Sequence, residues 1–238
     1  MLRIEDIDSQ RCRPHFEAAI HEDLAWLGLA WESPVRRQSE HLDDYRRALA
    51  RMAERGLIYR CFKTRAQVLD EIGRASHAPP APFRGGPLAP SEETRLIAEG
   101  RPYAWRLSLA AAKRELSGFS SLSFVEDGAG LIAARPELAG DVILARKDLG
   151  VAYHLAVVVD DALQGVTQVI RGADLFDATH IQRLLQALLA LPTPTYRHHS
   201  LLLRPDGKRF AKRDQAETLR DLRARGVTPQ ALRDELAV

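Results

Sequence analysis

Arg171 and Tyr153 are the first side chains in this sequence whose positions suggest ligand binding. Arg171 follows a run of mostly β-branched residues at positions 166–170 and precedes a helix pattern. In open α/β sheets, ligands bind in the crevice beyond the end of a strand, next to a helix start. Tyr153 belongs to the preceding predicted strand and points into the same region if the two strands are neighbours. The two residues therefore predict a binding pocket at one edge of a sheet.

A basic segment after a Pro-Asp-Gly turn is the second chemical feature. Residues 208–213, KRFAKR, place four cations in six positions, with Phe210 as an apolar anchor. Such a segment is either an ordinary exposed loop or a mobile clamp for a polyphosphate. A lysine ammonium is a compact charge suited to the oxygens of a departing pyrophosphate. The density of cations around the anchor favours the clamp.

Composition limits the class of protein. The 238 residues can form one good core, or a core with a small insertion. A net charge of +2 does not by itself indicate a nucleic-acid binder. Two cysteines fit a reducing compartment without a disulfide framework, and the sequence has no stretch typical of a membrane span or signal peptide. We therefore expect a soluble, cytoplasmic protein.

Alternating helix and strand patterns predict an α/β fold that positions these side chains. Strands are expected at residues 1–8, 102–106, 141–147, 151–159, 166–170 and 199–204. Helices are expected at residues 16–27, from Ser39 to a stop at Gly56, from Asp177 with Ile181, Leu184, Leu185 and Leu188 on its apolar face, at residues 218–225 and from residue 228. Residues 107–117 fit either a helix or a strand with a loop, and residues 77–90 and 117–130 are expected loops.

The neighbouring His198 and His199 could suggest a metal site. Adjacent residues of a strand point to opposite sides, so the two imidazoles are poor joint ligands. Packing and surface roles are expected for them instead.

Four motifs in a fixed order carry a family resemblance. LRIEDID, VRRQSEH followed by a helix, YHLAVVVDDALQGVTQVIRGADL and DGKRFAKRD resemble the glutamyl-tRNA synthetase lineage of class I synthetases over nearly the whole chain. The sequence is most similar to the short bacterial branch of this lineage, the glutamyl-queuosine tRNA(Asp) synthetases. The resemblance implies that L-glutamate is activated with ATP and Mg²⁺ as glutamyl-adenylate. It further implies transfer to queuosine in the anticodon loop of tRNA(Asp), by a monomer.

The resemblance also implies a fold and a division of the chain. A Rossmann-like class I aminoacyl-tRNA synthetase catalytic core is expected in residues 1–60 and 141–195, with an insertion at residues 61–140. Residues 196–238 would hold a KMSKS-like loop and the C-terminal helices, without an anticodon-binding domain. The family's first strand and its HxGH-type motif do not occur in this sequence. We therefore expect an N-terminally truncated form, with weak activity or none.

Site residues follow from the resemblance position by position. Glu5 matches the acid that holds the glutamate amino group, and Tyr153 and Arg171 match the residues that bind the amino acid, the arginine offering a fork suited to a carboxylate. Lys212 matches the catalytic lysine on the ATP phosphates. The KMSKS-like motif consists of Arg209, Phe210, Ala211, Lys212 and Arg213, in which Phe210 and Ala211 replace the usual Met or Leu and Ser.

The zinc site of the family is degenerate in this sequence. Cys61 keeps the first cysteine of the usual pair, but Lys63 stands at the second. Phe83 and Pro87 fall where the family has a later Tyr and Cys. Because one thiolate cannot hold a four-coordinate zinc, no zinc is expected and Cys61 becomes a small buried side chain.

Two other functions remain open. The chain could be a fragment of a conventional glutamyl-tRNA synthetase, or a paralogue that binds tRNA or glutamate without catalysis. The sequence context on either side of the chain would separate these alternatives.

Overall fold

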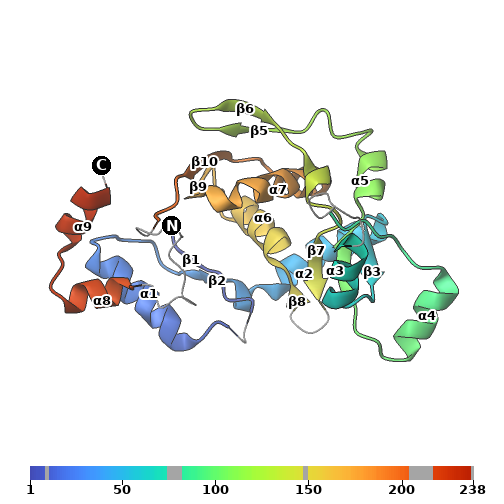
Figure 1. Cartoon of the computed structure of the whole chain (residues 1–238), viewed down its shortest axis with the longest axis horizontal. Helices are drawn as coiled ribbons and strands as arrows, with labels where there is room; N and C mark the ends of the chain where they lie inside the picture. The colour runs from blue at the N-terminus through green and yellow to red at the C-terminus, as the bar shows by residue number, and fades with distance from the viewer. Residues whose placement is uncertain (9–10, 74–81, 147–149, 204–216, 237–238) are drawn as a thin grey trace. The chain divides into compact units, whose positions relative to one another are not determined.

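The structure is a computed structural model that describes residues 1–8, 11–73, 82–146, 150–203 and 217–236 (Figure 1). The chain forms two compact units, Met1–Glu40 with Ser200–Val238 and His41–His199. Within the described ranges, no helix has both the length and the apolar character that a membrane crossing requires. The two units are described one at a time.

The described residues of the first unit form a short parallel pair of strands and three helices. Its elements are β1 (Arg3–Ile4), α1 (Pro14–Trp26), β2 (Arg36–Arg37), the 3₁₀ turn η1 (Gln38–Glu40), α8 (Leu219–Ala224) and α9 (Pro229–Leu236). β1 pairs with β2 in parallel, so α1 is the crossover between them. An ion pair of 2.8 Å between Arg223 on α8 and Glu22 on α1 joins residues far apart in the sequence.

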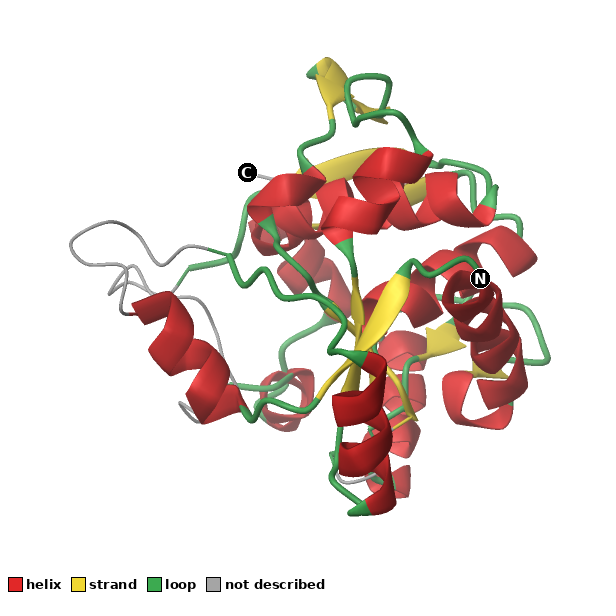
Figure 2. Ribbon diagram, turned by 90° about the vertical axis from the view of Figure 1, so that its right-hand side faces the viewer, coloured by secondary structure: helices red, strands yellow, loops and turns green. Residues whose placement is uncertain are grey.

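The described residues of the second unit form two four-stranded sheets. Figure 2 shows the strands in yellow and the helices in red. Its elements are α2 (Leu42–Glu54), β3 (Ile58–Cys61), α3 (Arg65–Gly73), α4 (Pro90–Ala98), β4 (Ala104–Leu107), α5 (Leu109–Glu115), β5 (Ser123–Glu126), β6 (Gly130–Ala133), η2 (Pro136–Leu138), β7 (Ile143–Arg146), β8 (Gly150–Val151), α6 (Tyr153–Leu163), β9 (Gln168–Gly172), η3 (Ala173–Leu175), α7 (Phe176–Leu189) and β10 (Thr195–His199). One sheet has the order β6-β5-β10-β9, in which β5, β10 and β9 run parallel and β6 is antiparallel. The other, β3-β4-β7-β8, is antiparallel throughout.

Helices α2, α6 and α7 form the core of this unit. The expected apolar face of α7 is confirmed, because Ile181, Leu184, Leu185 and Leu188 are all buried. α6 buries a continuous segment from Leu155 to Asp160. A helix with apolar residues on nearly all sides is buried within the protein and not at its surface.

The strand predicted at residues 151–159 is wrong. Only Gly150–Val151 is a strand, and the apolar run belongs to α6, whose first residue is Tyr153. A short buried apolar run has the same pattern in a strand and in a buried helix, so periodicity cannot separate them. The valines favour a strand by propensity, and packing between α2 and α7 overrides that preference.

Several predicted boundaries are also wrong. α2 begins after His41, and Ser39 instead donates to the carboxylate of Asp6 over 2.6 Å. α7 begins at Phe176 after a 3₁₀ turn, which leaves Asp177 in its first turn, where its charge favours the helix dipole. The predicted strand at 199–204 is replaced by β10, which ends at His199, and β5 and β6 begin within or at the end of the predicted loop at 117–130.

The other predicted elements agree with the structure, whereas β3, α3 and α4 were not predicted. The strand predicted at 166–170 is β9, those at 102–106 and 141–147 are β4 and β7, and the first predicted strand is β1, shortened to two residues. Residues 107–117 form a helix, α5, capped by Ser108. The helices expected at residues 218–225 and from residue 228 are α8 and α9: Thr218 caps α8, and α9 begins at Pro229, where the hydroxyl of Thr228 accepts from the main-chain N–H of Ala231 over 3.1 Å. The predicted four-part division of the chain stays a prediction.

Candidate ligand-binding site at Arg171

Arg171 lies on β9, directly opposite His198 of β10. Its Nε–H donates to Nε2 of His198 over 3.1 Å. Its Nη2 donates to the carbonyl of Leu175 over 3.2 Å and to Oγ1 of Thr179 over 2.7 Å. The guanidinium carbon also stands 5.5 Å from the ring centroid of Tyr196. These contacts fix the orientation of a cation at the carboxyl end of a parallel strand.

One nitrogen of Arg171 stays available. Among the described residues, Nη1 has no hydrogen-bond partner, whereas Nε and Nη2 are both used within the protein. The guanidinium therefore offers a ligand chiefly its Nη1 end, and not the whole fork that the sequence suggested. A cation with a fixed direction and free N–H groups is suited to an anionic oxygen.

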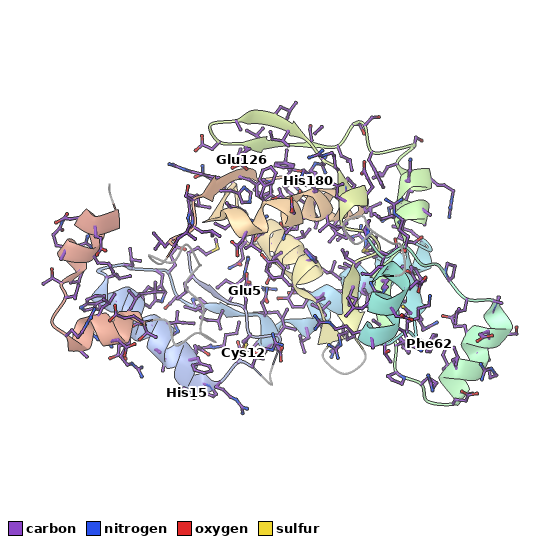
Figure 3. The ribbon with its side chains drawn as sticks, in the orientation of Figure 1. Glu5, Cys12, His15, Phe62, Glu126 and His180 are labelled. Atoms are coloured by element: carbon purple, nitrogen blue, oxygen red, sulfur yellow. The ribbon has the colours of Figure 1, made fainter. Side chains whose placement is uncertain are left out.

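A buried carboxylate is linked to this arginine through His198. Glu126, at the end of β5 and labelled in Figure 3, accepts the main-chain N–H of His198 at Oε1 over 2.8 Å. Its Oε2 lies 2.8 Å from Nδ1 of the same histidine. The side chain of His198 is 4% exposed and that of Glu126 is 9% exposed. The three parallel strands β5, β10 and β9 thus carry a continuous chain of contacts from a carboxylate to the arginine.

Tyr153 and His154 open helix α6, and His154 lies within electrostatic range of Arg171. Burial, and after it the charge of Arg171, lowers the pKa of His154 to about 4. Tyr153 is 37% exposed. The expectation that Tyr153 comes from a neighbouring strand is wrong, because it begins a helix. The first turn of α6 nevertheless belongs to the surroundings of Arg171.

Glu5 belongs to the first unit and follows β1. Its carboxylate accepts from Arg3 over 3.0 Å. It lines a hollow of about 560 Å³ together with Cys12, Phe16 and Ser39, so it is accessible to a ligand. Figure 3 labels Glu5 and Cys12 within this unit. The role that the resemblance gives to Glu5 stays a prediction.

The predicted KMSKS-like loop lies outside the described residues. This applies to Arg209, Phe210, Ala211, Lys212 and Arg213. The role of Lys212 as the lysine on the ATP phosphates therefore rests on the sequence.

The region of the degenerate zinc site is filled by hydrophobic side chains. Cys61 is buried in one cluster with Tyr59, Val68 and Phe83. The ammonium of Lys63 stands 5.5 Å from the ring centroid of Phe83. Two positions that the resemblance places at the family's zinc site thus hold a cation and an aromatic ring that lie close together. Within the described part of the chain, no group of three or more His, Cys, Asp or Glu residues could hold a metal ion.

Sequence reasoning missed Glu126, Thr179 and the role of His198. The sequence predicts a loop at residues 117–130, and a loop gives Glu126 no position on a sheet. The expectation for the histidine pair agrees with the structure in one respect, since the side chain of His198 is buried and His199 is exposed. An acid after the alternating segment Ser123 to Val125 was the signal that could have indicated a strand end.

Comparison with known families gives a match over the full sequence. The family model described as tRNA synthetases class I (E and Q), catalytic domain, matches residues 1–238. The chain is 44% identical to the glutamyl-Q tRNA(Asp) synthetase of Rhodobacter capsulatus, with 98% of this chain and 86% of that protein covered. It is 40% identical to the glutamyl-Q tRNA(Asp) synthetase of Symbiobacterium thermophilum, with 100% of this chain and 75% of that protein covered.

More distant relatives are longer. The chain is 36% identical to the glutamate–tRNA ligase of a Synechococcus species and covers 49% of its length. A crystal structure of a glutamate tRNA ligase from Elizabethkingia meningosepticum in complex with its amino acid superimposes with a TM-score of 0.71 at 27% identity. That superposition covers 90% of this chain and 45% of the ligase. The chain thus spans about half the length of these ligases.

Proposed function

Because the chain belongs to the class I tRNA synthetases of the E and Q type, we propose that it activates L-glutamate with ATP and Mg²⁺ and transfers it to queuosine in tRNA(Asp). Similarity to the glutamyl-Q tRNA(Asp) synthetases carries this proposal: the identity is 44% and 40% over at least 98% of the chain. Conventional glutamate–tRNA ligases are similar at a lower identity of 36%. The α/β fold and the ligand-binding geometry at Arg171 are compatible with both.

Glutamate recognition is assigned to Arg171. The attacking carboxylate must keep its electron density, so a guanidinium is better placed on the side-chain carboxylate of the amino acid. A cation there also separates glutamate from glutamine, whose amide is neutral. The Nη1 end of Arg171, which has no hydrogen-bond partner among the residues that the structure describes, supports this role. Tyr153 and Glu5 are proposed to contribute to amino-acid binding, the latter through the amino group, as the resemblance implies.

Adenylate formation in this scheme needs no nucleophilic side chain. The glutamate α-carboxylate attacks the α-phosphate of ATP in line, the bond to the β-phosphate breaks, and pyrophosphate leaves. The protein contributes position and charge. Lys212 is proposed to stabilise the charge that develops on the departing phosphates. The hydroxyl of queuosine then attacks the mixed anhydride and AMP leaves.

Charging with labelled glutamate tests the proposal. The substrates are tRNA(Asp) with queuosine, tRNA(Asp) without queuosine, and tRNA(Glu). We expect label only on the queuosine-containing tRNA(Asp). Label on tRNA(Glu) would contradict the proposal and favour a conventional glutamate–tRNA ligase, the second candidate, which the 36% identity supports. Glutamate binding without glutamate-dependent exchange between pyrophosphate and ATP would favour either a binding protein without catalysis or the loss of activity expected from the missing HxGH-type motif.

A further inference from the structure

We infer that Glu126 and His198 are positioning residues: the carboxylate fixes the tautomer of the imidazole, and the imidazole holds Arg171 in the orientation that binds a ligand carboxylate. This inference deepens the proposed function and rests on it for the identity of the ligand, L-glutamate. The internal contacts are independent of that identity. They join residues of β5, β10 and β9, three adjacent parallel strands.

The direction of each hydrogen bond follows from what each group can donate. Arg171 cannot accept a hydrogen bond, so Nε2 of His198, 3.1 Å away, must carry a lone pair. The ring proton is therefore on Nδ1, where Oε2 of Glu126 accepts it over 2.8 Å. Oε1 of the same carboxylate already accepts the main-chain N–H of His198. Both oxygens of Glu126 thus act as acceptors, as an ionised carboxylate requires.

Thr179 completes the arrangement. Its Oγ1 accepts from Nη2 of Arg171 over 2.7 Å and lies 3.3 Å from Nε2 of His198. Thr179 is fully buried in α7. The imidazole lies parallel to the ring of Tyr196, with centroids 6.2 Å apart, and edge-on to Phe176 at 5.2 Å. A ring enclosed in this way cannot turn freely. Its tautomer therefore decides whether Nε2 presents a lone pair or a proton to Arg171.

Loss of the hydrogen bonds that hold Arg171 within the protein would increase the entropy that its side chain loses on ligand binding. An arginine side chain has many rotamers, and holding two of its nitrogens within the protein lowers the entropy lost when the third binds an anion. A donor at Nε2 of His198 would face the Nε–H of Arg171 and repel it. The tautomer of His198 should therefore affect the affinity for the ligand carboxylate more than the folding of the sheet.

The isosteric variant Glu126→Gln gives the first test. In this variant the main-chain N–H of His198 still donates to the oxygen of the new side-chain amide, in the position of Oε1. The amide NH₂ then takes the position of Oε2 and faces Nδ1 of His198. That arrangement moves the ring proton to Nε2, opposite the guanidinium. We expect the KM for glutamate to rise about tenfold or more, with the KM for ATP changed by less than about twofold. Asp127→Asn, at the exposed neighbouring acid, is the matched control and should leave both values unchanged.

Two replacements of His198 separate the two ring nitrogens. The amide of His198→Asn lies near the position of Nδ1 and keeps contact with Glu126, but offers nothing to Arg171. The longer His198→Gln brings an amide oxygen to the position of Nε2. We expect the glutamine variant to retain a KM for glutamate close to that of the wild type, and the asparagine variant to resemble Glu126→Gln. A purely structural role would instead lower the stability of both and change both KM values.

Nitrogen-15 NMR of the histidine rings supplies a readout that needs no substrate. His198 of the wild-type protein should show its proton on Nδ1, and Glu126→Gln should show it on Nε2. A wild-type ring protonated at Nε2, or at both nitrogens near neutral pH, would overturn the inference, as would an unchanged KM for glutamate in Glu126→Gln. Failure of the wild-type protein to bind glutamate would refute the proposed function and the ligand of Arg171, while the NMR result still decides how the arginine is held.

Discussion

The phenol of Tyr45 on α2 donates a hydrogen bond of 2.8 Å to the carboxylate of Asp160 on α6. Both side chains are fully buried, and they are separated by more than a hundred residues in the sequence. The contact fixes α6 against α2 and therefore fixes the helix whose first turn lies near Arg171. A buried polar bond of this kind specifies one packing arrangement of the two helices.

Tyr45→Phe should lower the free energy of unfolding by about 1–3 kcal/mol, because the buried carboxylate of Asp160 loses the hydrogen bond from the phenol. Chemical denaturation followed by circular dichroism measures this change. Asp43→Asn is the control, since it removes an exposed ion pair with Arg46 and one charge in the first turn of the same helix, and should cost little. Equal stabilities of the Tyr45 variant and the wild type would show that the bond contributes nothing.

The stability of the protein should fall in mild acid partly because of His154. Its pKa in the folded state is lowered to about 4 from the ordinary value of 6.5, chiefly because the ring is buried. Above pH 6.5 the ring is neutral in both states, and stability is unaffected by this group. Between 6.5 and 4 the unfolded chain binds a proton that the folded protein excludes, so the free energy of unfolding decreases by up to ~1.4 kcal/mol per pH unit. Below about 4 this contribution stops changing.

His154→Gln tests that dependence, because glutamine stays neutral throughout. The loss of stability between pH 6.5 and pH 4 should be smaller in the variant than in the wild type, whatever other groups titrate in this range. His15→Gln, at an exposed histidine, should leave the pH profile of the wild type unchanged. A profile of the His154 variant that parallels the wild type would contradict the assignment.

The protein should contain no stoichiometric zinc. Cys61 lies in a hydrophobic cluster with Phe83, and Lys63 contributes a cation where the family has a second thiolate. Elemental analysis of protein purified without chelator measures the metal content directly. Treatment with a chelator should leave the melting temperature unchanged, because no structural metal would be removed. One zinc per chain that disappears in Cys61→Ser would refute the prediction.

Kinetics should separate the roles of Arg171 and Lys212. Arg171→Lys cannot keep the bonds to His198 and Thr179 while it binds a carboxylate, so the KM for glutamate should rise about tenfold or more. Lys212→Ala should instead reduce kcat by about 100-fold and leave the KM for glutamate nearly unchanged, because its charge acts on the departing phosphates. Arg197→Lys, at an exposed arginine of β10, is the control. A raised KM for glutamate in Lys212→Ala, together with a reduced kcat and an unchanged KM in Arg171→Lys, would contradict the assigned roles.

The sequence by itself determined the family, the strand before Arg171 and the apolar face of α7. These features depend on local order and short-range periodicity, which a single sequence records directly. The motifs around Glu5, Arg171 and Lys212 likewise indicated which residues to consider, through their order along the chain.

Only the tertiary structure decided that residues 153–163 are a helix and that Glu126 contacts the ring of His198. A buried apolar run carries no pattern that distinguishes helix from strand, so its packing partners decide. Glu126, Arg171 and His198 meet because parallel strands bring distant segments side by side. Such pairing depends on contacts across the sheet, which neither composition nor local spacing encodes.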